Sequence, residues 1–173
     1  MLEAGGTAPD FSLPGIVDGE PSYYDLHRPL RDGCAAVLLF APVDFVPTIT
    51  PDLVAAGEAE WRDRDDVVTW AITADSLFAH DAYATHHGIE IPLLTDRFAG
   101  IADAYDVVHD EFRAHRDVPR RAAFVVDPDW TVQFAWESDD PTQLPDDSPL
   151  DGVAAALSTI LGEDVAAPAV QYE

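Results

Sequence analysis

The run from Ala35 to Ala41 constrains the fold more than any other feature of the chain. All seven of its residues are apolar, and it is bounded by Asp32-Gly33 on one side and Pro42 on the other. A short, continuous apolar run between turn residues is typical of a strand that is buried on both faces. Such a strand needs helices on both sides of its sheet, so the run predicts an α/β domain.

The remaining segments alternate between helical and strand patterns, as an α/β domain requires. Pro51 is well placed for the first turn of one helix, and Ser76 and Gly88 are suited to cap and end another. In the latter helix we expect an inner side formed by Leu77, Phe78, Ala82 and Tyr83. The patterns predict helices over 50–64, 76–87, 99–107 and about 148–161, strands over 67–73 and 91–96, and a hairpin over 122–136.

The 173 residues suffice for one sizeable core, so we expect a single domain over 1–173 with a short acidic tail at its carboxyl end. The chain begins without a signal-peptide pattern, and no apolar run approaches the length of a membrane span. We therefore expect a cytoplasmic protein. Its single cysteine excludes an internal disulfide and a Cys-x-x-Cys motif.

The net charge of −24 comes from 33 acidic residues and nine basic ones, all of which are arginine. The acidic residues recur in every segment, which indicates a uniformly acidic surface. Such a surface suits a salt-rich, halophilic cytoplasm, where the Debye length falls to about 3 Å at 1 M salt. The charge argues against nucleic acid and anionic membranes as partners, because phosphate binding needs a cationic surface.

The segment that follows the apolar run resembles the active-site loop of the peroxiredoxins, which are thioredoxin-fold thiol peroxidases. Phe40, Pro42 and Phe45 match the loop pattern of that family, and Asp52 matches its acidic position as a shorter side chain. Further similarities lie in Ala8-Pro9-Asp10-Phe11 and in Ile91-Pro92-Leu93-Leu94-Thr95-Asp96. The resemblance covers about residues 5–162. It implies a thioredoxin-like fold of peroxiredoxin type, with a mixed central sheet, helices on both faces and no cofactor.

Two positions depart from the family pattern. Val46 stands where the family keeps a threonine, and Ile49 stands where it keeps the cysteine that attacks the peroxide. An isoleucine side chain cannot form a thiolate or a sulfenic acid, so the first chemical step is lost at this position. Of the residues that the resemblance marks as catalytic, only Pro42 and Arg121 remain.

Arg121 therefore has no thiolate to serve. A guanidinium near a core is costly unless it is paired, by several kcal/mol per ion. Asp52, in the first turn of the expected helix, is the obvious partner for it. The alternative is that Asp52 only complements the helix dipole, which would contribute roughly 0.3–1 kcal/mol.

Cys34 is the only thiol left. It precedes Pro42 by eight residues along a strand, which at ~3.3 Å per residue places the two about 26 Å apart. Cys34 should therefore not reach the loop. The simplest interpretation is a small residue at the start of a strand, and the alternative is a redox-active thiol.

The histidines, tryptophans and basic segment suggest structural roles first. His80, His86 and His87 lack an aligned acid for a metal site, and a role at a helix end is more plausible. The four tryptophans fit core or subunit contacts. The irregular segment 109–121 holds four of the nine arginines; it either receives an anion or acidic partner, or pairs with the acidic surface.

Two functional hypotheses from different classes follow. The first is a catalytically silent peroxiredoxin homologue, which retains the loop as a binding or assembly surface. The second is a thiol-dependent oxidoreductase that acts through Cys34, and it requires an exposed thiol with a lowered pKa. The resemblance implies a homodimer, and a hetero-oligomer with an active homologue is a third possibility.

Overall fold

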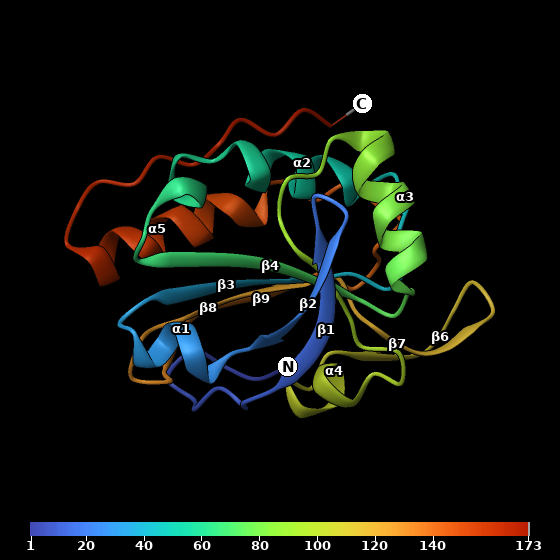
Figure 1. Ribbon diagram of the computed structural model, residues 1–173, viewed down its shortest axis with the longest axis horizontal. Coiled ribbons are helices and arrows are strands. Elements are labelled where there is room, and N and C mark those ends of the chain that lie inside the picture. The colour runs from blue at the N-terminus through green and yellow to red at the C-terminus, as the bar shows by residue number, and fades with distance from the viewer. Residues whose placement is uncertain (173) are drawn as a thin grey trace.

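One mixed sheet of seven strands organises the molecule in the computed structural model, which describes residues 1–172 (Figure 1). Its strand order is β2-β1-β5-β4-β3-β8-β9, and β6 and β7 form a separate two-stranded hairpin. The strands are β1 Ser12–Val17, β2 Glu20–Asp25, β3 Ala35–Phe40, β4 Val67–Thr73, β5 Leu93–Thr95, β6 Val108–Phe112, β7 His115–Pro119, β8 Ala122–Val126 and β9 Val132–Glu137.

The apolar run forms β3, at the interior of this sheet. It pairs in parallel with β4 and antiparallel with β8, and all six of its residues are buried. The parallel β3–β4 pair brings the carboxyl ends of two strands to one edge of the sheet. The loop that leaves β3 at this edge carries the candidate site.

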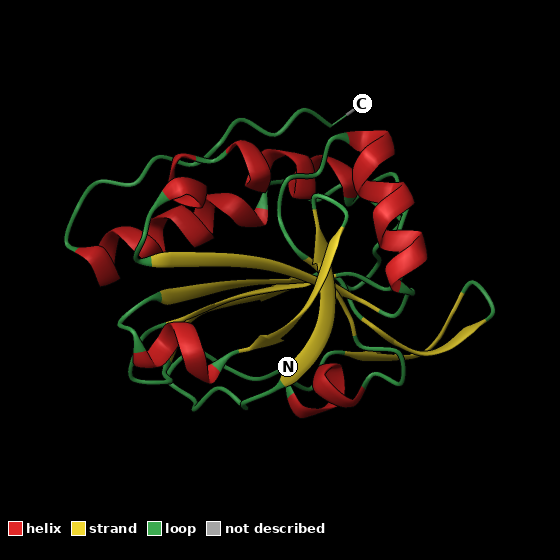
Figure 2. Cartoon of the chain, viewed as in Figure 1, coloured by secondary structure: helices red, strands yellow, loops and turns green. Residues whose placement is uncertain are grey.

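Helices cover both faces of the sheet, as Figure 2 shows. The face that carries α2 and α5 lies opposite the one that carries α1 and α4 (Figure 1). The helices are α1 His27–Arg31, α2 Thr50–Glu58, α3 Leu77–His87, α4 Gly100–Ala104 and α5 Pro149–Leu161, with a 3-10 turn, η1, over Glu60–Asp63. The predicted α/β arrangement with a mixed central sheet is confirmed.

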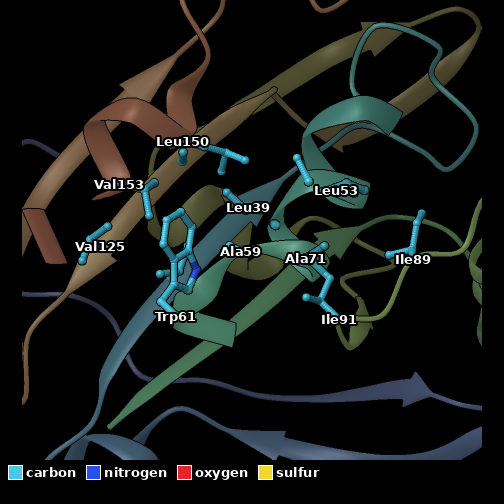
Figure 3. Close-up of a cluster of buried hydrophobic side chains, with 14 of the residues drawn as sticks. Leu39, Leu53, Ala59, Trp61, Ala71, Ile89, Ile91, Val125, Leu150 and Val153 are labelled. Carbon is cyan, nitrogen blue, oxygen red and sulfur yellow. The ribbon is translucent and has the colours of Figure 1, made fainter. Parts of the chain in front are cut away.

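The core divides into two clusters because the side chains of β3 alternate between the faces. Val37 and Leu39 join the cluster beneath α2 and α5, whereas Leu38 and Phe40 join the one beside α1 and α4. Figure 3 shows the first cluster, in which Trp61 packs among side chains from α5 and the sheet. Both faces of β3 are therefore buried, as the sequence predicts.

The helix predicted over 50–64 is interrupted. Ala59 adopts an extended conformation with ψ 144°, so α2 ends at Glu58 and η1 follows it. The interruption places the indole of Trp61 fully inside the core. Helical spacing alone could not reveal this break, because Trp61 also fits a continuous amphipathic helix.

The inner side predicted for α3 is wrong at two positions. Ser76 caps the helix and Gly88 ends it in the left-handed conformation, as expected, but the buried residues are His80 and Tyr83. Phe78 is 89% exposed, and Ala82 also faces solvent. The helix is rotated about its axis relative to the predicted orientation, because the side chain of His80 points inward and makes a polar contact that is described below.

Two further segments differ from the sequence prediction. The stretch after Val107 is a regular hairpin, β6–β7, rather than irregular. Its strands are polar and largely exposed, so they lack the alternation that signals a half-buried strand. The helix predicted over 99–107 is confined to Gly100–Ala104 as α4.

The carboxyl-terminal segment after α5 runs back across the molecule without regular secondary structure (Figure 2). Its backbone is fixed by side chains, since Val165 N–H donates to Ser158 Oγ and Ala166 N–H donates to Glu60 Oε1. It reaches the first turn of α2 at Tyr172. No helix among residues 1–172 is long and apolar enough to cross a membrane.

Candidate functional site

The candidate site lies where the loop 41–49 passes from β3 into α2. Pro42 and Val46 are buried in this loop, and Ile49, 3% exposed, is the residue immediately before α2. The carbonyl of Val46 accepts hydrogen bonds from the N–H groups of Ile49 and Thr50 and from the Thr50 hydroxyl. The amino terminus of α2 is therefore held to the loop by hydrogen bonds to the Val46 carbonyl, and the residue that precedes the helix, Ile49, is aliphatic.

Arg121 and Asp52 meet beneath this loop. Arg121 Nη2 contacts Asp52 Oδ2, and both side chains are less than 5% exposed. The guanidinium also donates to the carbonyl of Gln143 at 3.4 Å and lies 5.6 Å from the ring centre of Trp136. The pair that the sequence predicted is present, so Asp52 does more than complement the helix dipole.

Asp52 has two further partners from distant parts of the chain. The hydroxyl of Tyr172 donates to Asp52 Oδ1 at 2.6 Å, and that of Ser148 donates to the same oxygen at 3.4 Å. Burial raises the pKa of Asp52, while Arg121 and the hydroxyl donors oppose this rise. The carboxylate thus joins α2, β8, α5 and the carboxyl-terminal segment at one point.

Almost no free space remains beside the pair. The cavity there has a volume of about 10 Å³, which is about the size that one water molecule needs. Its walls include Ile49, Asp52, Arg121, Trp136 and Pro149. The Nε atom of Arg121 is buried and has no hydrogen-bond partner among the described residues.

A second buried polar cluster lies on the other side of the loop. His80 Nδ1 is 2.7 Å from Asp44 Oδ2, and both side chains are at most 1% exposed. The Thr73 hydroxyl donates to Asp44 Oδ1 at 2.9 Å, and the Asp44 N–H donates to Asp75 Oδ2 at 2.6 Å. This cluster fixes the loop against β4 and α3.

This cluster was not predicted from the sequence, and the helix-end role expected for His80 is wrong because its ring is buried against Asp44. His80 and Tyr83 are three residues apart and therefore share one face of α3, which is a signal that could have revealed the inward histidine. Tyr83 extends the polar contacts, because its hydroxyl lies 2.7 Å from that of Thr50. Burial raises the pKa of Tyr83, so it remains a neutral phenol.

The loop also presents an aromatic side chain at the surface. Phe45 has a left-handed backbone, with φ 61°, and its ring is 46% exposed. The ring packs 4.6 Å from that of Tyr83 and 5.8 Å from that of His87, measured between centroids. A neighbouring hollow of about 550 Å³ is lined by loop residues from Val43 to Thr48 together with Phe112, Arg113 and Thr142.

Cys34 lies at the opposite end of β3 from this loop. Its side chain is buried, and its S–H donates to the carbonyl of Asp65 at 3.3 Å. Burial raises the pKa of this thiol, and the nearby carboxylates of Asp32, Asp66 and Asp65 raise it further. The sulfur is therefore held as a protonated thiol away from the site.

The other histidines mentioned above do not form a metal-binding arrangement. His86 and His87 lie in the last turn of α3, where a positive charge is favoured by the helix dipole. Among residues 1–172, no three His, Cys, Asp or Glu side chains come together in a way that could hold a metal ion.

These features define a thioredoxin-like domain whose β3–α2 loop faces a buried arginine. The chain belongs to the AhpC/TSA family, whose model matches residues 4–135. Alkyl hydroperoxide reductase E of Mycobacterium tuberculosis is 30% identical over 161 residues, which cover 91% of this chain and 99% of that relative. The selenocysteine-containing peroxiredoxin PrxU of Peptoclostridium acidaminophilum is 29% identical over 77% of this chain, which spans 66% of the relative's length.

Solved structures agree with the fold. AhpC of Mycobacterium tuberculosis superposes with a TM-score of 0.75 at 20% identity, covering 93% of this chain and 94% of the other. A reduced 2-Cys peroxiredoxin of Plasmodium vivax gives a TM-score of 0.75 at 21% identity, covering 92% and 96%. The chain thus matches the family in sequence and matches these solved structures in fold.

Proposed function

We propose that this chain is a peroxiredoxin-family protein that does not reduce peroxides by the family mechanism and serves instead in binding or assembly. One observation carries the proposal. Ile49, at the position that the resemblance assigns to the attacking cysteine, is buried beside a cavity of about 10 Å³. The position offers neither a nucleophile nor space for a peroxide next to Arg121.

The chemistry of the family explains why this matters. A thiol peroxidase needs a thiolate that attacks one peroxide oxygen, releases the other as water or alcohol, and becomes a sulfenic acid. Neither Ile49 nor Val46 has a lone pair for this step. Arg121, which would stabilise the thiolate, is instead paired with Asp52.

The alternative that Cys34 provides the thiol lacks support. That hypothesis requires an exposed thiol with a lowered pKa. Cys34 is 9% exposed, and burial and neighbouring carboxylates raise its pKa. Its location at the far end of β3 also separates it from Arg121.

A peroxide-consumption assay tests the catalytic half of the proposal. We expect the protein and its C34S variant to consume neither hydrogen peroxide nor an organic hydroperoxide in excess dithiol and molar salt. Alkyl hydroperoxide reductase from a relative serves as the positive control. Turnover that disappears in C34S would revive the thiol alternative, and turnover that persists in C34S would show chemistry outside both hypotheses.

The assembly half rests on exposed aromatic side chains. Phe78 and Phe98 are 89% and 84% exposed, and large aromatic residues are enriched in subunit interfaces. We propose a homodimer, with a hetero-oligomer as the alternative. Light scattering after gel filtration should give the dimer mass for the native chain and a lower mass for F78S or F98S; a monomeric native chain would contradict the homodimer.

A further inference from the structure

Three arginines differ from all the others in this acidic protein. Six of the nine arginines lie within 4.0 Å of a carboxylate: Arg28, Arg31, Arg62, Arg64, Arg120 and Arg121. Arg97, Arg113 and Arg116 have no carboxylate at this distance among the described residues. All three residues are exposed to solvent.

Two of these arginines line one pocket. Arg97 follows β5, and Arg116 lies on β7 beside His115. Together with Ala74, Asp75, Ser76 and Val118 they line a hollow of about 330 Å³ that is open to solvent. Figure 1 shows the β6–β7 hairpin projecting from the sheet near one end of α3, and Ser76 caps that end.

The amino terminus of α3 adds a favourable potential to this pocket. The helix is 11 residues long, and its partial positive charge is concentrated at its first turn. The Ser76 hydroxyl and carbonyl accept the N–H groups of Ala79 and His80. The N–H groups of Leu77 and Phe78 lie in the part of the first turn that has no intrahelical partner.

Asp75 is the one acidic residue in the wall of the pocket, and one of its two carboxylate oxygens accepts a hydrogen bond from the loop. Asp75 Oδ2 accepts the backbone N–H of Asp44 at 2.6 Å, while the Asp75 N–H donates to the Thr73 hydroxyl at 3.1 Å. Asp75 thereby belongs to the Asp44–His80 cluster and makes no ion pair with Arg97 or Arg116. The arginine donors of the pocket remain available to a ligand.

We propose that this pocket binds a small phosphate-type oxyanion, either inorganic phosphate or a phosphate monoester. The guanidinium group presents several N–H donors in a planar fork that matches two phosphate oxygens. Arg97 and Arg116 line the pocket with two such groups, and the first turn of α3 adds its positive potential. The imidazole of His115 also lines the pocket, but its Nδ1 is engaged with the carbonyl of Arg113 at 3.1 Å. A volume of about 330 Å³ also leaves room for a small organic group on the phosphate.

The overall charge of the chain cannot by itself attract phosphate. A chain with a net charge of −24 repels anions at long range, so it offers no general attraction for phosphate. Binding must therefore come from short-range contacts to Arg97 and Arg116. The proposal is independent of the peroxide chemistry, because none of the lining residues belongs to the loop 41–49 or contacts Arg121.

Isothermal titration with inorganic phosphate, and separately with phenyl phosphate, tests the site in sodium chloride of about 1 M, where the Debye length is about 3 Å. We expect saturable binding of one anion per chain. R97A and R116A should each weaken it about tenfold or more, equivalent to ~1.4 kcal/mol. Tighter binding of phenyl phosphate would identify the monoester as the ligand class.

R31A is the matched control, since Arg31 is also exposed to solvent but lies on α1 beside Asp32, at 4.0 Å. This variant removes the same unit of charge and should leave the affinity unchanged. Absence of saturable binding by the native chain would overturn the proposal. An equal loss in R31A, R97A and R116A would also overturn it, because it would reduce the effect to net charge.

Discussion

Asp52 and Arg121 form a buried ion pair beneath the β3–α2 loop. The two charges are almost fully buried, and such a pair is stable only if its geometry is good and other donors satisfy the carboxylate. Tyr172 and Ser148 supply those donors. Arg121 thereby takes part in a structural contact between four segments of the chain.

Replacing Asp52 tests this interpretation. Breaking a buried pair leaves an uncompensated charge and typically costs about 3–5 kcal/mol, so D52A should lower the free energy of unfolding by about 3 kcal/mol or more. Chemical denaturation in molar salt measures this quantity. D151A is the control, because Asp151 is an exposed first-turn acid of α5 whose loss removes only a dipole contribution of roughly 0.3–1 kcal/mol. Equal losses in both variants would show that the pair contributes nothing beyond the dipole.

At the scale of the element, the carboxyl-terminal segment closes the candidate site. Tyr172 ends this segment with a hydrogen bond to Asp52, and Val165 packs into the core cluster beneath α2 and α5. Burial and the hydrogen bond to Asp52 raise the pKa of Tyr172 to about 12. The segment therefore docks through a neutral phenol.

This raised pKa fixes the pH range in which docking weakens. A group whose pKa is higher in the folded state binds its proton more tightly there, so its contribution is complete below the ordinary value of 10.0 and disappears as the pH rises through about 12. Titration of tyrosinate absorbance should show one ionisation near pH 12 that Y172F lacks. If Y172F instead lost an ionisation near pH 10, the phenol would not be docked.

The sequence predicted the elements whose signals are local, and it missed those that depend on distant contacts. The apolar run, Ser76 and Gly88 correctly located β3 and the ends of α3. The break at Ala59 and the outward turn of Phe78 depend on how Trp61 and His80 are buried, which no local pattern records. Tertiary packing overrides a weak helical periodicity in both places.

The same distinction applies to the candidate site. The Asp52–Arg121 pair followed from the cost of an unpaired guanidinium, so it was predictable from two residues and the family resemblance. The Tyr172 contact spans 120 residues, and the Asp44–His80 contact joins a loop to a helix face that was assigned the wrong orientation. The spacing of His80 and Tyr83 could have indicated the inward face of α3, but no motif identifies Asp44 or Tyr172 as a contact partner.

At the scale of the whole molecule, the dominant property is the charge of −24. Repulsion among like charges opposes the compact state, and salt screens it. On this physical ground we propose that the protein is adapted to high salt. The six paired arginines contact only eight of the 33 acidic side chains, so most carboxylates rely on solvent and ions.

The midpoint of thermal unfolding should therefore rise with potassium chloride. Between about 0.1 M and 1 M salt we expect an increase of about 10 °C, which corresponds to roughly 3 kcal/mol for a chain of this size. The triple variant E58Q/D81N/D103N removes three exposed charges that make no arginine contact, and it should start from a higher midpoint and rise less. An identical salt response in the variant would attribute the effect to general salting-out rather than to screening.

The central claim is that the folded chain carries out no peroxide chemistry, either at the β3–α2 loop or at Cys34, and intact-protein mass spectrometry tests it most directly. The folded chain is treated with a stoichiometric organic hydroperoxide in molar salt, and any added oxygen is located by peptide fragmentation. We predict no oxygen on Cys34 in the folded chain, under conditions that oxidise the same thiol in the denatured chain. Rapid oxidation of Cys34 in the folded chain, or an adduct on a residue of the loop 41–49, would contradict the claim.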